Sequence, residues 1–494
     1  MRSLLFPFVL LCPVSLLSGQ DLPSLCSPSL EAPDPAVQIA SDALASSVVV
    51  VDSLLLREGS SFLLAGREIR LGTPEFAFGG GFVATGVWAQ DPSAEILFAW
   101  KDDVVAASFR SEQLHFQLAW AGNDLHRWIQ LPLQAGPACG TTFAHAIPDS
   151  TPSSVSKGSN RNHETIDVMV VYTTFALNGH GGSASSMNNA ITLGVKQTNN
   201  TFANSGINQR ITLVHTAEMV GYNEKSGTSG FSSMLSDLTN GSGALSTAHS
   251  LRDQYGADFV TMLVGSSAYG GIAWLMTNVS PSFEKWAFNL VTQFSVNRDY
   301  VLAHELGHNM GCAHDRQNSG GSGAYSYSYG YRTSGSPSYR TVMAYAPGVR
   351  IGRWSGPNVV YNGQALGRAN QEENVRTLNN TYSTCEDFRD KFPILNVPTL
   401  IANFSSAIQV SNASPGDQVI MGLSLTGPGP TGTPLGTALL TPPIYASPFL
   451  SADSAGQVSL TWKVPSSLKG LPVWFHAANT TSGRLTNAET RTVL

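Results

Sequence analysis

A short run of histidines with one acidic residue carries the strongest chemical signal in this sequence. His304-Glu305-Leu-Gly-His308 places two imidazoles four residues apart, and a third, His314, follows six residues later. Positions i and i+4 share one face of a helix, so His304 and His308 can direct ring nitrogens at one cation. Three His ligands leave the fourth position of a tetrahedral zinc ion open for water, which is the arrangement of catalytic zinc.

The residues between the second and third histidines support this interpretation. Gly311 lies three residues after His308, where a residue that accepts a positive φ can end the helix and turn the chain back. That turn would bring His314 to the same ion. The structural alternative is an ordinary amphipathic helix with surface histidines, but it does not require Gly311, His314 and Asp315 at these fixed offsets.

The stretch from His304 to Asp315 resembles the extended zinc signature of the metzincin metallopeptidases. Asp315, directly after the third His, resembles the reprolysin/adamalysin-like branch, and Ile166–Thr173 looks like the first strand of its bacterial members. Thr341–Ala346 resembles the Met-turn of these enzymes, which implies that Met343 lies beneath the zinc. The resemblance covers about 163–390, under half of the chain.

This resemblance implies a zincin-like catalytic domain of the α+β/α/β type. Its parts would be a mixed twisted sheet, an active-site helix, the Met-turn and a C-terminal helix near Gln371–Leu378. Tyr345 departs from the reprolysin pattern, because it lies two residues after Met343 as in astacin- and serralysin-like enzymes. It is either a fifth, displaceable ligand or oxyanion donor, or a packed wall residue of the site.

The expected reaction follows from charge. Zinc lowers the pKa of a bound water and polarises a carbonyl, and Glu305 would take the proton of that water and pass it to the leaving amine. We therefore predict a zinc-dependent endopeptidase with one catalytic Zn²⁺. Two alternatives remain: a zinc exopeptidase or amidase, and a non-catalytic adhesion or binding protein with a vestigial peptidase domain. Degenerate domains usually lose the Glu or a His, whereas all four residues are present here.

Substrate would be held by a glycine-containing strand upstream of the helix. Family resemblance implies that Gly270, Gly271, Ile272 and Ala273 form an edge strand against which an extended peptide adds as a further strand. The structural alternative is an ordinary sheet edge with a Gly bulge. Trp274 is equally compatible with the core and with a substrate subsite.

The cysteines suggest latency or disulfides. Pro137-Ala-Cys-Gly140 resembles the core of the cysteine switch in reprolysin and matrix-metalloprotease propeptides, so Cys139 could occupy the open zinc position as a thiolate. Alternatively, Cys26 pairs with Cys139, and Cys312 would then pair with Cys385, tying the C-terminal helix to the active-site region. If Cys139 is a switch, Cys26 is left unpaired.

The catalytic segment, 163–390, is flanked by two regions that read as β-structure. We expect a β-rich propeptide over 20–147, a polar linker over 148–162 and a β-sandwich accessory domain over 391–494. Strict alternation in Gln457–Val464 places Val458, Leu460, Trp462 and Val464 on one face. A helix is expected from Asn297, with Asn297 as its N-cap and Asp299 in the first turn.

The beginning of the chain and its composition indicate export. Met1-Arg2 precedes an apolar run from Leu4 to Leu17, which is too short to span a bilayer, so residues 1–19 are expected to be a signal peptide of a secreted protein. With 28 Lys+Arg against 34 Asp+Glu and a net charge of −6, nucleic acid is not an expected partner. We expect protein or peptide substrates, no membrane span in the mature form and a monomer. Calcium is conceivable, but no local acidic cluster marks a site.

Overall fold

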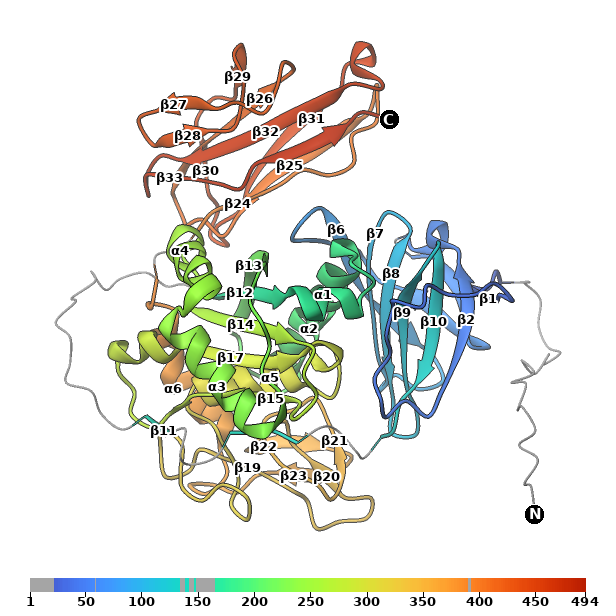
Figure 1. Cartoon of the computed structure of the whole chain (residues 1–494), viewed down its shortest axis with the longest axis vertical. Coiled ribbons are helices and arrows are strands. Elements are labelled where there is room, and N and C mark those ends of the chain that lie inside the picture. The colour runs from blue at the N-terminus through green and yellow to red at the C-terminus, as the bar shows by residue number, and fades with distance from the viewer. Residues whose placement is uncertain (1–21, 58, 134–137, 142–145, 148–164, 390–391) are drawn as a thin grey trace.

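The computed structural model describes residues 22–57, 59–133, 138–141, 146–147, 165–389 and 392–494. The predicted signal peptide and the whole of the predicted linker lie outside these ranges. Three β-rich parts follow one another along the chain and pack together, with few helices, most of them in the middle part (Figure 1). The chain is therefore multidomain, and the middle part holds the histidine motif. Among the described residues, no helix combines the length and the apolarity needed to cross a bilayer.

The N-terminal part is one antiparallel sheet in the order β1-β2-β10-β9-β8-β7-β6-β4-β3, with β5 paired to β6. Its strands are β1 (Cys26–Pro28), β2 (Ala45–Val51), β3 (Ser61–Leu64), β4 (Arg67–Leu71), β5 (Glu75–Ala77), β6 (Gly81–Trp88), β7 (Glu95–Lys101), β8 (Val104–Arg110), β9 (His115–Gly122) and β10 (Leu125–Gln130). A short 3-10 helix, Ser53–Leu55, follows β2.

Alternation along these strands divides the side chains between two faces. Ile96 and Phe98 of β7 belong to the core of the N-terminal part itself. Leu97 and Ala99 point to the other face and pack against Leu193 of helix α2 (Ala184–Ala203) in the middle part. The N-terminal sheet is thus attached to the middle part through one face of its central strands.

The middle part is built on a five-stranded sheet in the order β13-β12-β14-β17-β15. Four strands run parallel and the edge strand β15 runs antiparallel to β17. The strands are β12 (Thr165–Thr173), β13 (Arg210–Met219), β14 (Phe259–Val264), β15 (Gly271–Ala273) and β17 (Phe288–Thr292). The helices are α1 (Thr174–Gly179), α2, α3 (Gly227–Asn240), α4 (Ser246–Tyr255), α5 (Val301–Asn309) and α6 (Asn374–Cys385).

Helices cover both faces of this sheet, which explains the continuous apolar runs of its strands. Val168 and Val170 of β12 pack with residues of α2, α5 and α6. Met169 and Val171 face the opposite side and pack with residues of α3 and α4. Helix α5, with the histidine motif, therefore lies on the same face as α2, to which the N-terminal sheet is attached.

Short elements complete the middle part. They are β11 (Ala146–Ile147), β16 (Leu275–Met276), β18 (Ala313–Asp315), β19 (Tyr329–Gly330), β20 (Tyr339–Arg340), β21 (Val349–Arg350), β22 (Gly356–Tyr361) and β23 (Gln364–Leu366), with 3-10 turns at Gly243–Leu245, Pro281–Trp286 and Gln293–Ser295. The predicted edge strand at Gly270–Ala273 is β15, and Trp274 separates it from β16.

The C-terminal part has two antiparallel sheets that share one core. The first contains β24 (Ile394–Asn396), β25 (Ser405–Ser411) and β31 (Val458–Lys463). The second contains β26 (Gln418–Ser424), β29 (Ile444–Ala446), β30 (Leu450–Ser451), β32 (Pro472–Asn479), β33 (Arg484–Leu485) and β34 (Glu489–Thr492); β27 (Thr431–Thr433) and β28 (Gly436–Ala438) pair separately, and Ser466–Leu468 is a 3-10 turn. The predicted alternation around β31 is confirmed, because its apolar residues all belong to this core.

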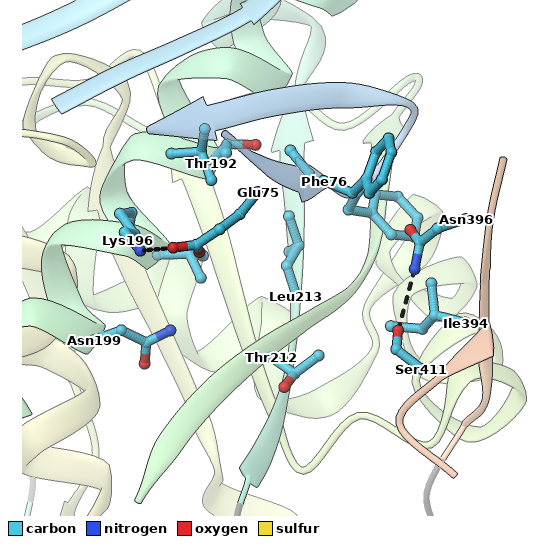
Figure 2. A pocket seen from close by; sticks show the side chains of 14 residues that line it. Glu75, Phe76, Thr192, Lys196, Asn199, Thr212, Leu213, Ile394, Asn396 and Ser411 are labelled. Atoms are coloured by element: carbon cyan, nitrogen blue, oxygen red, sulfur yellow. Dashed lines mark hydrogen bonds and ion pairs between the residues drawn. The ribbon is translucent and has the colours of Figure 1, made fainter. Parts of the chain in front are cut away.

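All three parts meet around a cavity of about 170 Å³. Figure 2 shows Glu75 of β5 reaching Lys196 of α2, with Leu213 of β13 behind them and Asn396 of β24 on the far side. The Glu75 carboxylate lies 2.6 Å from the Lys196 ammonium. Side chains from regions more than 300 residues apart in the sequence therefore line one space.

The start of the active-site helix differs from the prediction. Helix α5 begins at Val301, not near Asn297, and both Asp299 and Tyr300 before it adopt left-handed backbone angles, with φ of 53° and 58°. Asp299 is buried and forms ion pairs with Arg110 and Arg298, so its carboxylate does not serve the first helical turn. Asp299 was expected to stabilise the first turn of the helix, but it forms an ion pair with the distant Arg110 instead. The C-terminal helix also lies later, since α6 runs over Asn374–Cys385 where Gln371–Leu378 was expected.

Candidate active site

Helix α5 and strand β18 bring the three histidines together. His304 and His308 lie one turn apart on α5, and all three imidazoles are buried. The helix ends because Gly311 takes a φ of 87°, and a Cβ at this position would stand 2.5 Å from the Cβ of Ala324. The chain then returns as β18 and places His314 opposite the helix. The predicted turn at Gly311 is therefore present.

The side-chain nitrogens of the histidines converge on one point. His314 Nε2 lies 3.1 Å from His304 Nε2 and 3.0 Å from His308 Nε2. Backbone carbonyls orient two of the rings from behind: Val342 O is 2.8 Å from His304 Nδ1, and Cys312 O is 2.8 Å from His308 Nδ1. When Nδ1 of each of these two rings carries the proton, its Nε2 has a free lone pair that faces the shared point.

This donor set fits a divalent cation. Burial lowers the pKa of His314 to about 3 and moves the pKa of His304 well below its usual range, so both rings are neutral. Lone pairs that face one another at about 3 Å would repel unless a cation lay between them. Cys139 Sγ joins the group, and its ligand atom and those of the three histidines all lie within 4.8 Å of one another. Imidazole and thiolate are the ligands that zinc prefers.

Glu305 lies beside this cluster and is completely buried. Its Oε2 is 3.5 Å from Cys139 Sγ, and its Oε1 has no hydrogen-bond partner among the described residues. Burial raises the pKa of Glu305 to about 8, against a smaller opposing effect of the Cys139 contact and of the Arg350 charge. A Cβ at Gly271 would stand 2.5 Å from Glu305 Oε1, so a residue without a side chain is required there. The carboxylate can therefore take and return a proton at the edge strand.

The edge strand β15 is occupied by a segment of the chain itself. Gly140 N donates to Gly271 O at 2.8 Å, and Gly270 N donates to Ala138 O at 2.7 Å. Thr141 continues this contact, because its hydroxyl accepts a hydrogen bond from Ala273 N at 2.8 Å. Residues 138–141, called the covering segment below, run parallel to β15 and carry Cys139 to the histidines.

Comparison with known proteins gives one family and one kind of relative. Residues 162–355 match the Reprolysin_5 model, described as metallo-peptidase family M12. A peptidyl-Asp metalloendopeptidase of Stenotrophomonas maltophilia is 28% identical over 320 residues, which cover 62% of this chain and 73% of the relative. A protein of the same name from Xanthomonas campestris pv. campestris is 29% identical over 310 residues, covering 60% and 71%.

The chain is a metalloendopeptidase. The matched range contains the sheet, α5 and the three histidines that the structure brings together. A solved structure titled "Structure of a chaperone-substrate complex" also aligns, with a TM-score of 0.35 and 16% identity over 60% of this chain and 44% of that one. Nothing further rests on that likeness.

The Met-turn residues lie where the metalloendopeptidase motif implies. Met343 is buried beneath α5, because a Cβ at Gly307 of that helix would lie 2.8 Å from Met343 Sδ. Asp315 ties this turn to the third histidine, since its Oδ2 accepts a hydrogen bond from Tyr345 N at 3.0 Å and its Oδ1 from Arg332 Nη2 at 3.0 Å. Asp315 is therefore a positioning residue that holds β18 against the Met-turn.

Tyr345 packs against the site and contacts the covering segment. Its ring centroid is 4.3 Å from that of His314, and its hydroxyl donates to Cys139 O at 2.9 Å. This geometry combines a wall position with a hydroxyl that points to the backbone at Cys139. Trp274, by contrast, donates from Nε1 to Thr239 Oγ1 at 2.7 Å and packs on Trp286, as expected of a core residue.

None of the predicted disulfides is present among the described residues. Cys26, Cys139, Cys312 and Cys385 are all free in the part of the chain that the structure describes. Cys312 and Cys385 are both buried, and burial raises the pKa of each thiol. Cys139 lies at the histidines while Cys26 lies in β1 of the N-terminal sheet, so these two are on different parts of the molecule. Cys312 and Cys385 lie near each other, because Cys385 also contributes to raising the pKa of Cys312, and their pairing stays a prediction.

Two site features were missed by sequence reasoning. Thr141 fastens the covering segment to β15, and Arg350 brings a buried positive charge close enough to lower the pKa of Glu305. Neither residue belongs to a motif, so no sequence signal marked them. No second group of His, Cys, Asp and Glu with metal-binding spacing is found within the described ranges, and no calcium site emerges there.

Proposed function

We propose that this chain is a secreted, zinc-dependent endopeptidase, made as a latent precursor, that hydrolyses internal peptide bonds of proteins. The observation that carries the proposal is the convergence of three buried imidazoles beside a buried carboxylate at the end of an edge strand. Three imidazoles with an open fourth position are typical of hydrolytic zinc.

His304, His308 and His314 would hold the ion, and the carbonyls behind the first two keep their Nε2 atoms aimed at it. Bound there, zinc would polarise the scissile carbonyl and make water more acidic. Glu305 acts as general base toward the attacking water and then as general acid toward the leaving amine. Its Oε1, which has no partner among the described residues, is the atom available for that proton.

An extended substrate would use the backbone groups that the covering segment now uses. Gly270 N and Gly271 O are the donor and acceptor that β15 offers at the active site. A peptide bound through main-chain hydrogen bonds is aligned without regard to its sequence, so side-chain pockets must supply specificity. Tyr345, whose hydroxyl faces the backbone of the bound segment, is suited to hold the substrate carbonyl in place.

Latency would come from the covering segment. Cys139 Sγ lies 3.6 Å from His308 Nε2 and 3.5 Å from Glu305 Oε2. As a thiolate it would fill the position that water needs, and the main-chain pairing with β15 blocks the place of the substrate at the same time. Cleavage between the N-terminal part and the middle part would then release the active enzyme.

The domain assignment follows the same proposal. Residues 1–19 would be a signal peptide, 20–147 a β-rich propeptide, 148–162 the linker that is cut, 163–390 a zincin-like catalytic domain and 391–494 a β-sandwich accessory domain. The shared core of the two C-terminal sheets supports the sandwich. The relatives are named for peptidyl-Asp cleavage, and we extend to this chain a preference for bonds next to aspartate.

Zymography of the purified protein, with and without a zinc chelator, tests the proposal. We expect a lytic band that chelation abolishes and added zinc restores, and its N-terminal sequence should begin between residues 148 and 165. Cleavage of a peptide blocked at both ends would establish endopeptidase action. Activity that survives complete removal of divalent ions would contradict the proposed function.

A further inference from the structure

A second buried cluster of charged groups lies beside the histidines. It contains Asp299 just before α5 and three arginines, Arg298, Arg340 and Arg350, all at most 4% exposed. Arg298 Nε is 3.0 Å from Asp299 Oδ2, and Arg350 Nη1 donates to Asp299 O at 3.1 Å. We call these four residues the guanidinium cluster. Three cations and one anion give the middle part a surplus of buried positive charge at this place.

Arg350 is the member of the cluster nearest to the chemistry. It lies in β21, directly after the Met-turn, and its Nη2 donates to Ala344 O at 3.3 Å. Ala344 directly precedes Tyr345, whose ring centroid lies 4.3 Å from that of His314. A group placed against Arg350 would therefore lie close to the wall of the active site.

The N-terminal sheet covers this place with an arginine of its own. Arg110 Nη1 is 2.6 Å from Asp299 Oδ1, and its Nη2 donates to Arg350 O at 3.1 Å. The guanidinium carbon lies 5.6 Å from the centroid of the Tyr300 ring. Arg110, Tyr300 and Arg350 also line a cavity of about 60 Å³ at the boundary between the two parts. Departure of the N-terminal part would open this cavity at Tyr300 and Arg350.

The hydrogen bonds of Arg340 and Arg350 indicate whether the opened cavity would bind an anion or a cation. Arg340 bonds to Gly348 O at 2.9 Å and Ala344 O at 3.1 Å, whereas Arg350 Nε has no partner among the described residues. A buried donor without a partner carries a desolvation cost that an anionic acceptor removes. After Arg110 leaves, Asp299 is still paired with Arg298. The cluster then contains no carboxylate that could accept a hydrogen bond from Arg350 Nε.

We propose that the space vacated by Arg110 is a substrate subsite in which Arg350 binds the carboxylate of an acidic substrate side chain. This inference rests on the proposed endopeptidase function. It assigns the preference for aspartate to a residue outside the zinc motif. The Tyr300 ring, over which the Arg110 guanidinium lies in the precursor, forms the apolar wall of the subsite.

Asp299 offers a competing possibility, because in the precursor it binds a cationic side chain, that of Arg110. A subsite built on Asp299 would prefer basic substrates. The remaining Arg298–Asp299 pair argues against it, since that carboxylate is already neutralised within the middle part.

The test uses the full-length protein after processing, with three quenched peptides that differ only by Asp, Asn or Arg at one position. The variants are R350Q and R350K, with R376Q as control, because Arg376 is an exposed arginine of α6. We expect the wild type and R376Q to prefer the Asp peptide over the Asn peptide by at least about tenfold in kcat/KM. R350Q should lose that preference, so its kcat/KM should fall about tenfold more on the Asp peptide than on the Asn peptide.

R350K keeps a charge but not the planar fork, so a partial loss of the preference is expected. It also keeps the test decisive if R350Q does not fold. An unchanged Asp/Asn ratio in both variants, or a preference of the wild type for the Arg peptide that D299N removes, would overturn the inference. Cleavage of no peptide by the wild type would contradict the proposed function itself, whereas cleavage without a preference for Asp would contradict only the subsite.

Discussion

The histidine cluster and the guanidinium cluster are neighbours with opposite origins. All three histidines come from the eleven residues 304–314, and one helix with its turn brings them together. The guanidinium cluster needs residues 298–299, 340 and 350, and the N-terminal sheet completes it with Arg110 and with Asp42, which pairs with Arg298 at 2.6 Å. The first cluster is complete within the middle part, whereas the second changes composition when the N-terminal part leaves. Catalysis should therefore depend on local geometry, and latency and specificity on long-range contacts.

The largest effect on activity is expected from a substitution beside the histidine cluster. E305Q removes the proton acceptor and leaves the three imidazoles in place, so activity on casein should fall by about 10²–10⁴-fold. The metal content of the purified protein should be unchanged. Retention of full activity would show that Glu305 is not the base, and loss of metal together with activity would show that it serves binding instead.

Substitutions at the guanidinium cluster should mainly lower the stability of the precursor. R110M leaves the buried Asp299 without one partner, and breaking a buried ion pair in this way costs about 3–5 kcal/mol. The free energy of unfolding of the full-length precursor in urea should fall by about this amount. K196M is the matched control, because Lys196 pairs across the same boundary with Glu75, which is 60% exposed, and should cost at most about 1 kcal/mol. Equal effects of the two variants would contradict the comparison.

The N-terminal sheet should also lose stability in mild acid. Burial lowers the pKa of His115 to about 3 and that of His126 to about 4, and His126 Nε2 accepts a hydrogen bond from Val105 N at 3.0 Å. Both rings titrate near 6.5 when unfolded. The folded pKa is lowered, so this stability is fully present above about pH 6.5 and is lost as the pH falls.

At pH 5 each histidine should reduce the stability of the sheet by about 2 kcal/mol relative to pH 7.5. Urea unfolding of the precursor at the two pH values measures the change, and H126Q should show roughly half of the wild-type difference. A precursor equally stable at both values would refute the neutral state assigned to these rings.

The smallest effect is expected at Cys139. C139A removes the thiol from the histidines but leaves the main-chain bonds of the covering segment to Gly270 and Gly271. The uncleaved precursor should therefore gain activity by only about tenfold, well short of the processed enzyme. An assay of a precursor with a mutated linker separates the two forms. No gain at all would mean that the main-chain pairing alone maintains latency.

Sequence patterns predicted the parts of the fold that depend on local periodicity. The strict alternation in Gln457–Val464 predicted that the apolar residues of β31 share one face. The i, i+4 spacing of His304 and His308 and the glycine at 311 predicted the convergence with His314. These features need only neighbours in the chain, which is why a single sequence contains them.

Predictions that required distant contacts were less successful. The start of α5 was placed near Asn297 because Asp299 looks like a first-turn residue, but Arg110, 189 residues away in the chain, holds that carboxylate instead. The cysteine pairings depend on distant contacts as well: Cys26 and Cys139 lie in different parts of the molecule, and the pairing of Cys312 with Cys385 stays a prediction. The assignment of Cys139 to the zinc position stays a prediction that the contact with His308 supports.

The amino-acid sequence by itself determined which groups could hold a metal and take a proton, because residues four apart share one face of a helix and Gly311 can turn the chain back toward that face. Only the tertiary structure decided what lies around those groups. It brought the covering segment onto β15, buried Arg350 beside Glu305 and set Arg110 against Asp299. Such contacts join elements that are far apart in the chain, and burial and charge, not spacing, select them.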